Sequence, residues 1–294
     1  MIIDERIIKD LTELYNDGAI PGDIQDALHL DGLVRAEDGQ RSFATRALPS
    51  YYIGNRKAKT VMVMLNPGQS VQQANDELMD ELNKRSMKNA KDIENYHNWC
   101  INYGHKDKER QDNFDLKQAF FFHKWRGTGI ALPSDLNPDI DSKTKLDAKE
   151  IILTQKLQLE LLPYASRSIS NFNPKKIHLL VPFVETLFEE IFSCERKYVI
   201  FCSRKYHDIF NAYNAIHPNA IKFDKKYIKM GKIGDSKISA SCSLITINFK
   251  NKSLKAIIAN TFPHQGLPNA YRLMEMYGNY CYKQYKKHLK EARH

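Results

Sequence analysis

The chain has 294 residues, 42% of them hydrophobic, and 44 Lys and Arg against 35 Asp and Glu give it a net charge of +9. This length and composition suit one large globular domain, and no apolar run is long enough to cross a bilayer. The positive charge favours a polyanionic partner, with nucleic acid as the first choice.

Metal and cofactor motifs are absent from the sequence. No two of the five cysteines have C-x-x-C spacing, no G-x-G-x-x-G follows a strand, and no P-loop is present. We therefore expect no metal, no cofactor and no disulfide framework, in a protein of the reducing cytoplasm. Residues 1–15 carry acidic residues early, so they predict a helix and not a signal peptide.

The first predicted core strand is Thr60–Leu65, an apolar run that ends at Asn-Pro-Gly. Ser70 is placed to cap a helix over Val71–Asn83. Residues 72–148 are polar and resemble an insertion, with an aromatic cluster at 120–125.

Strand and helix patterns then alternate. Leu157–Leu162 predicts the second strand, and the helical spacing of residues 181–194 leads into the third, Tyr198–Cys202. A helix over residues 204–213 follows that strand. This alternation predicts an α/β fold with a mostly parallel sheet.

The last part of the chain predicts a hairpin, a strand and a helix. Residues 219–250 show the alternation of an antiparallel hairpin, and Leu254–Ala259 predicts the fourth core strand. The basic, tyrosine-rich segment 271–294 predicts a helix. The expected fold is a three-layer α/β/α domain over residues 1–294, in which a four-stranded, mostly parallel sheet carries the insertion and the hairpin.

In such folds the functional site lies at the carboxyl ends of the strands. Asn66, Pro163, Ser203 and Asn260 follow the four predicted strands directly. We therefore expect these positions to share one edge of the sheet.

The segments at these four strand ends resemble the uracil-DNA glycosylase superfamily, particularly its mismatch-specific and single-strand-selective branches. "MLNPGQS" (64–70) is similar to the first motif, G-x-N-P-G, although Met64 stands in place of the first glycine. "LELLPY" (159–164) resembles the second conserved strand, where the single-strand-selective branch has N-L-C-P. Residues 183–210 resemble the central helix–strand–helix unit, and "AIIANTFPHQGLP" (256–268) resembles the last strand and the DNA-intercalating loop.

The resemblance implies base excision, in which the base is flipped out of the stack and the bond to its sugar is hydrolysed. Asn66 would orient the water. An amide is a poor general base, so this role suits a reaction with a dissociative transition state. The alternative is a plain Asn-Pro-Gly turn without chemistry. Gly68, between the substrate-binding candidates Pro67 and Gln69, stands where the uracil-specific branch has a tyrosine that blocks carbon 5 of the pyrimidine. The glycine would leave room for a 5-substituted base, or it serves only an unusual backbone dihedral.

Glu160 replaces the asparagine that contacts uracil in the family. A carboxylate accepts from the exocyclic amine of cytosine, and a protonated carboxyl can also donate to the ring nitrogen. The substitution favours a cytosine-like base, and a surface or salt-bridged glutamate is the alternative.

The loop "FPHQGLP" departs from the family pattern because Phe262 precedes the proline and His264 follows it. We expect His264 to hydrogen-bond the departing base, with phosphate contact as the alternative. Gln265, Gly266 and Leu267 resemble the wedge that fills the space left by the flipped base.

Two further sets of candidates stay open. Arg204 and Lys205 follow the third strand and either hold phosphates or begin a helix. The aromatic residue that stacks on the base is not identified, and core packing is the default for the candidates. These candidates are Tyr51, Tyr52, Phe120, Phe121, Phe122 and Trp125.

Together these features predict a monomeric, monofunctional DNA glycosylase that excises a modified base, with 5-substituted cytosine of phage DNA, such as hydroxymethylated or glucosylated cytosine, as the expected substrate. One alternative is a repair glycosylase for uracil or G:T mismatches. An alternative of another class is a catalytically silent binder of modified or single-stranded nucleic acid.

Overall fold

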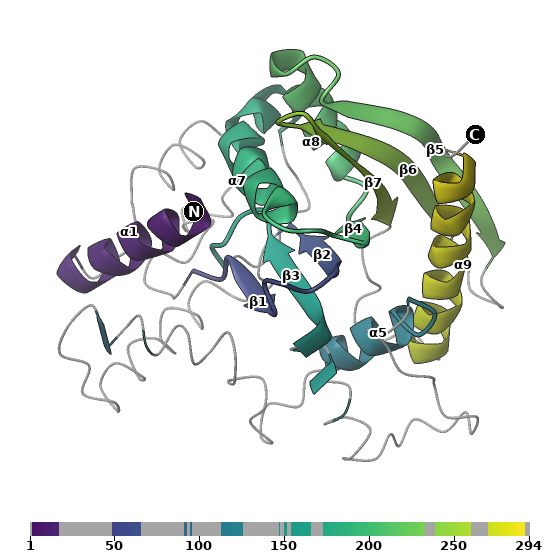
Figure 1. The fold of residues 1–294 in the computed structure, drawn as a ribbon, viewed down its shortest axis with the longest axis horizontal. Coiled ribbons are helices and arrows are strands. Elements are labelled where there is room, and N and C mark those ends of the chain that lie inside the picture. The colour runs from purple at the N-terminus through teal and green to yellow at the C-terminus, as the bar shows by residue number, and fades with distance from the viewer. Residues whose placement is uncertain are drawn as a thin grey trace.

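The computed structural model describes residues 2–17, 49–65, 113–125, 154–165, 173–232, 239–259 and 270–291, together with residues 91, 92, 95, 147, 150 and 151. One seven-stranded sheet has the order β1-β3-β2-β4-β7-β6-β5 (Figure 1). Its strands are β1 (Tyr52–Gly54), β2 (Thr60–Met64), β3 (Lys156–Glu160), β4 (Tyr198–Cys202), β5 (Ile221–Lys232), β6 (Ser239–Phe249) and β7 (Lys252–Ala259).

The α/β class predicted from the sequence is confirmed, but the prediction of a four-stranded sheet is wrong. The strands β3, β2, β4 and β7 are parallel neighbours in the middle of the sheet. On one side of these four strands β1 pairs antiparallel with β3, and on the other side β6 pairs antiparallel with β7. The antiparallel pair β5–β6 lies in the segment predicted as a hairpin, and it belongs to the same sheet as the parallel strands.

Helices cover both faces of the sheet. Each buried strand sends alternate side chains to opposite faces, and the helices pack against them. One face, with Val61 and Val63, packs against α1 (Ile2–Asp17), α7 (Val181–Phe192) and α8 (Tyr206–Ile216). The short 3₁₀ helix η2 (Pro174–Leu180) leads into α7 on that face. The other face, with Met62, packs against residues of α5 (Asn113–Phe121) and α9 (Ala270–Glu291).

The predicted helices near both ends and in the middle of the chain correspond to α1, α7, α8 and α9. The helix expected over Val71–Asn83 lies outside the described residues. That the chain forms one domain with an insertion at 72–148 stays a prediction. No described helix is both long enough and apolar enough to cross a membrane.

Candidate functional site

The carboxyl ends of the parallel strands meet at one edge of the sheet. Met64, the last residue of β2, is level with Glu160, the last residue of β3. Pairing continues beyond both strands, because the Leu161 amide donates to the Met64 carbonyl (3.0 Å) and the Leu162 amide donates to the Leu65 carbonyl (2.9 Å). Hydrogen bonding between these two segments therefore extends to Leu65, the residue that precedes Asn66.

A helix from the other half of the chain is attached to the same edge. The Tyr206 hydroxyl, in the first turn of α8, donates to the Met64 carbonyl at 2.6 Å. Ser203 follows β4 at this edge and is buried. The described parts of three predicted motifs thus lie close together.

Glu160 ends a row of buried polar side chains on one face of β3. Lys156, Gln158 and Glu160 alternate with leucines, so they point to the same face, where Gln118 of α5 joins them. All four are less than a tenth exposed. A buried row of this kind needs internal hydrogen bonds, because unpaired polar groups are costly away from water.

The hydrogen bonds run along the row from Lys156 to Glu160. The Lys156 ammonium donates to Gln118 Oε1 and, at 3.2 Å, to Gln158 Oε1. Gln118 Nε2 also donates to Gln158 Oε1 at 3.2 Å. Gln158 Nε2 donates to Glu160 Oε1 at 2.7 Å.

Burial dominates the ionisation of Glu160. Desolvation raises the pKa of its carboxyl to about 8, against a smaller lowering by the Gln158 hydrogen bond and by the Lys156 charge. Glu160 is therefore mostly neutral at pH 7. Its second oxygen, Oε2, is buried and has no hydrogen-bond partner within the described part of the chain.

When Glu160 is ionised, its negative charge raises the pKa of two further groups, Cys202 of β4 and Tyr206 of α8. Burial raises the pKa of the Cys202 thiol and of the Tyr206 hydroxyl. Both groups therefore stay neutral at physiological pH, and Glu160 is the group of this cluster that titrates near neutrality.

Most of the other predicted site residues lie outside the described residues. These are Asn66, Pro67, Gly68, Gln69, His264, Gln265, Gly266 and Leu267. The described residues that precede them are Leu65, one residue beyond β2, and Ala259, the last residue of β7.

Arg204 and Lys205 are both at the start of α8. Lys205 is its N-cap residue, which fits the reading of a helix start. Arg204 is exposed and its Nη2 donates to Ser241 Oγ at 3.1 Å, so it connects the end of β4 with β6.

Core packing accounts for the aromatic cluster at 120–125. Phe121 and Trp125 have no exposed surface, and their rings lie 6.0 Å apart in a stacked arrangement. Trp125 Nε1 donates to the carbonyl of Gly278 at 3.1 Å. At the other side of the molecule, the Tyr51 hydroxyl donates to Asp10 Oδ2 at 2.9 Å.

Sequence reasoning missed the partners of Glu160. The alternation in "KLQLE" is the signal that places Lys156, Gln158 and Glu160 on one face of a strand. Nothing in the sequence marks Gln118, which lies 40 residues before Gln158 and reaches it only in the folded chain.

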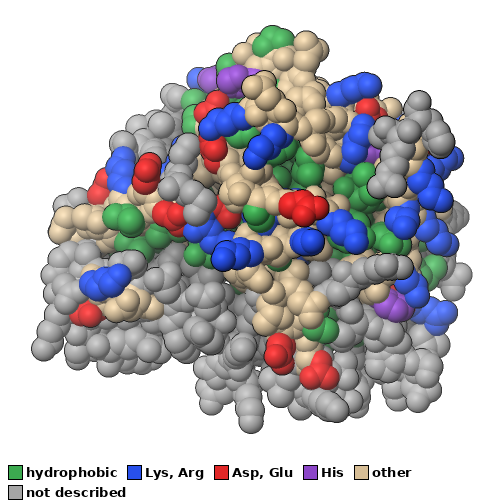
Figure 2. Space-filling model, in the orientation of Figure 1, with side chains coloured by type: hydrophobic (Ala, Val, Ile, Leu, Met, Phe, Trp, Pro, Cys, Tyr) green, Lys and Arg blue, Asp and Glu red, His purple; other side chains and the backbone are tan. Residues whose placement is uncertain are grey.

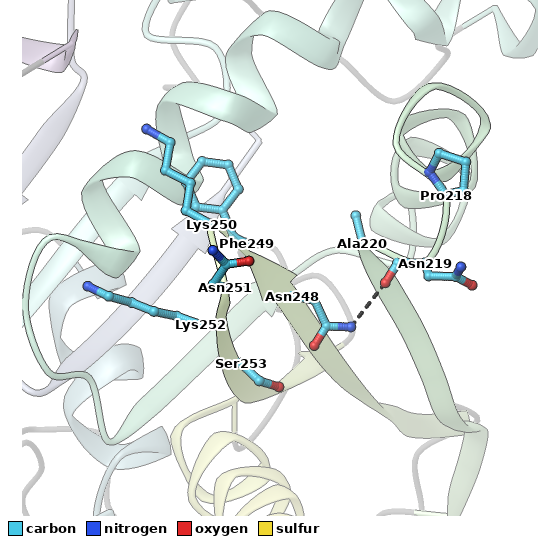
Figure 3. Close-up of a pocket in the computed structure, with 9 residues that line it drawn as sticks. All are labelled: Pro218, Asn219, Ala220, Asn248, Phe249, Lys250, Asn251, Lys252 and Ser253. Atoms are coloured by element: carbon cyan, nitrogen blue, oxygen red, sulfur yellow. Dashed lines mark hydrogen bonds between the residues drawn. The ribbon is translucent and has the colours of Figure 1, made fainter.

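A hollow of about 390 Å³ lies at the opposite end of the sheet, around the turn between β6 and β7 (Figure 3). Asn248 crosses it, donating from Nδ2 to the Asn219 carbonyl at 3.0 Å. Its lining residues are Pro218, Asn219, Ala220, Asn248, Phe249, Lys250, Asn251, Lys252 and Ser253. None of the predicted site residues lines this hollow.

Among the described residues, no group of three or more His, Cys, Asp or Glu side chains is arranged to hold a metal ion. Comparisons with protein-family models, with curated proteins and with solved structures found no match for the chain.

Proposed function

We propose that the protein is a DNA glycosylase of the uracil-DNA glycosylase superfamily, which hydrolyses the N-glycosidic bond of a flipped, modified base. The observation that carries the proposal is the shared edge of β3, β2, β4 and β7, since each of the four segments that resemble family motifs includes the carboxyl end of one of these strands. A buried carboxyl with one oxygen lacking a partner in the described structure lies at this edge.

The proposed chemistry assigns roles to Asn66, His264 and the three residues that follow His264. Asn66 orients the water at the sugar carbon, and His264 hydrogen-bonds the departing base. Because departure leaves negative charge on the base, a nearby donor lowers the barrier. The segment Gln265–Leu267 fills the space that the flipped base leaves in the stack.

The proposed substrate is a 5-substituted cytosine, including hydroxymethylated or glucosylated forms. Glu160 is buried and neutral near pH 7, so it can donate as well as accept. Gly68 would leave space beside carbon 5 of the base. Bulky cytosines of this kind occur in the DNA of some bacterial viruses, so we propose a role in defence. We further propose that the protein acts in the cytoplasm and is a monomer.

The position of the positive charge supports DNA as the partner. Five lysines against one aspartate give β5 a net +4, and five Lys and Arg against two glutamates give α9 a net +3, so these two elements carry +7 of the chain's +9. They lie side by side, with the Tyr280 hydroxyl donating to the Ile228 carbonyl at 3.1 Å. Figure 2 shows Lys and Arg side chains gathered on this side of the molecule.

The basic surface reaches the edge that carries Glu160. Ile228 of β5 is level with Cys242 of β6, which is level with Ala259, the last residue of β7. Lys229, the next residue of β5, is exposed and lies past that level. Lys229 therefore lies at the same end of the sheet as Glu160, and β5 is five positions away from β3 in the strand order.

Substitution of Asn66 tests the enzymatic reading. Asn66→Ala should reduce base release by about 100-fold or more, whereas DNA affinity should stay close to that of the wild type. Asn211→Ala, the same change at an exposed position of α8, is the matched control and should leave base release unchanged. Unaltered base release in Asn66→Ala would overturn the assigned role.

A double charge reversal tests the basic surface. Lys283→Glu with Lys287→Glu changes two exposed residues of α9 and should weaken binding of every DNA sequence alike. Because each lost phosphate contact lowers the salt dependence, the slope of log affinity against log salt should fall by about 2. An unchanged slope would remove these two positions of α9 from the DNA interface.

The alternatives differ in what the wild type releases. A repair glycosylase would release uracil, or thymine opposite guanine, and would ignore modified cytosine. A silent binding module would release no base and would still bind modified or single-stranded nucleic acid in a salt-dependent way.

A further inference from the structure

We infer that Gln158 is a specificity-determining residue: together with Lys156 and Gln118 it fixes the Glu160 carboxyl so that Oε1 accepts within the protein and Oε2–H is presented to the base. The base selected is then one whose ring nitrogen lacks a proton and lies next to an amino group, as in cytosine. This inference rests on the proposed function and adds the residues that set its selectivity.

The orientation of the Gln158 amide follows from its partners. Two N–H groups, from Lys156 Nζ and Gln118 Nε2, each lie 3.2 Å from the same Gln158 oxygen. An ammonium has donors and no acceptor, so the atom facing it must be the carbonyl oxygen. The opposite amide orientation would set three donors against each other in a buried place.

The orientation of Gln158 decides which oxygen of Glu160 carries the proton. With its carbonyl oxygen engaged, the Gln158 amide nitrogen donates to Glu160 Oε1 at 2.7 Å. A proton on Oε1 would compete with that donor, so the neutral carboxyl keeps its proton on Oε2. This Oε2 is the buried oxygen without a partner within the described part of the chain.

A carboxyl fixed in this way distinguishes pyrimidines by their ring nitrogen. The ring nitrogen of cytosine accepts from Oε2–H, while its amine donates to the remaining lone pair of Oε1. Uracil and thymine carry a hydrogen on that nitrogen, so two donors would face each other. One unmade buried hydrogen bond costs a factor on the order of ten to a hundred in the preference.

The preference should depend on the protonation of Glu160. The titratable and charged groups that face it are Lys156, Cys202 and Tyr206, and burial keeps the last two neutral. When Glu160 loses its proton, Oε2 no longer donates. The preference for cytosine-type bases should therefore fall as the pH rises through about 8.

The test is Gln158→Leu, which keeps the size of the side chain and removes both hydrogen-bonding groups. Gln155→Leu is the matched control, because Gln155 is exposed and lies just before β3. Rates of base release are compared between DNAs that carry 5-hydroxymethylcytosine and uracil. We expect Gln158→Leu to reduce the preference for the cytosine about tenfold or more and the control to leave it unchanged.

A second readout needs no activity. Carbon-13 NMR of the Glu160 carboxyl, assigned by its loss in Glu160→Gln, measures the pKa in the free protein. The Gln158 hydrogen bond lowers that pKa, so Gln158→Leu should raise it. If Gln158→Leu does not fold, Gln118→Leu removes one of the two donors to the Gln158 oxygen and should give a smaller change in the same directions.

The outcomes separate this inference from the proposed function. If the wild type releases no base but the carboxyl titration shifts in Gln158→Leu, the glycosylase proposal fails while the internal hydrogen bond stands. If base release is normal and its preference stays unchanged in Gln158→Leu, the specificity role of Gln158 is overturned. An unshifted titration would overturn the hydrogen-bonded row itself.

Discussion

The ionisation of Glu160 should make the stability of the fold depend on pH in a defined window. Burial raises the pKa of this carboxyl from 4.5 to about 8, so the folded state binds the proton more tightly than the unfolded state does. The stabilising contribution is complete below about pH 4.5, decreases as the pH rises, and is lost above about pH 8. At 1.36 kcal/mol per pKa unit the full change is on the order of 5 kcal/mol.

Glu160→Gln isolates this effect, because glutamine has a similar shape and does not titrate. Urea unfolding of both proteins between pH 5 and 9 gives the free energy of unfolding at each pH. The wild-type value minus the variant value should fall by roughly 1.4 kcal/mol per pH unit up to about pH 8 and then level off. Asp10 titrates in both proteins, so its contribution cancels in the difference.

The control for this measurement is an exposed carboxyl. Glu195 has 85% of its side chain exposed, and Glu195→Gln should give a curve parallel to that of the wild type. A difference between wild type and Glu160→Gln that does not change with pH would refute a buried, neutral Glu160.

Three further predictions concern packing and buried charge. Gly278→Ala should destabilise the fold by about 2 kcal/mol in urea unfolding, because the new Cβ would lie 1.9 Å from the Phe121 carbonyl oxygen. Alanine favours helices over glycine, so a stabilised variant would contradict the close approach of α5 and α9. Glu190→Gln should cost about 3 kcal/mol and lower the melting temperature, because the buried carboxylate pairs with Arg56 at 2.5 Å; an unchanged melting temperature would show that this pair contributes nothing. Burial raises the pKa of Asp10 to about 6, so Asp10→Asn should make the decrease in stability smaller as the pH rises from about 4 to 6, and a decrease as large as that of the wild type would contradict a raised pKa of Asp10.

The sequence located the parallel strands because strands buried on both faces are almost continuous apolar runs. The predicted bounds of β3 were displaced by two residues at its carboxyl end, Leu157–Leu162 against the observed Lys156–Glu160. At the amino end the strand begins one residue earlier, at Lys156, which an apolar pattern leaves out and whose ammonium donates to Gln118 and Gln158.

The edges of the sheet were harder to predict. With three residues, β1 has little pattern of its own, and it is a strand because Tyr52 and Gly54 pair with residues of β3 more than 100 positions away. The hairpin was recognisable from its alternation, but its addition to the parallel sheet depends on the pairing of β6 with β7. Such pairings are set by tertiary packing, which a local pattern does not contain.

At the candidate site, the sequence identified Glu160 as an unusual charge within an apolar run, and the structure buries it. The hydrogen bonds that orient it join β3 to α5 and depend on distances that only the folded chain defines. The role of Asn66 stays a prediction, since it lies outside the described residues.

Mass spectrometry of the free bases released from matched DNAs tests the central claim most directly. One DNA carries uracil, one carries thymine opposite guanine, and three carry unmodified, hydroxymethylated or glucosylated cytosine at the same position. The account predicts release of the 5-substituted cytosines and little or none of the other bases. Release of uracil alone would contradict the role of Glu160, and binding of every DNA without release of any base would contradict catalysis.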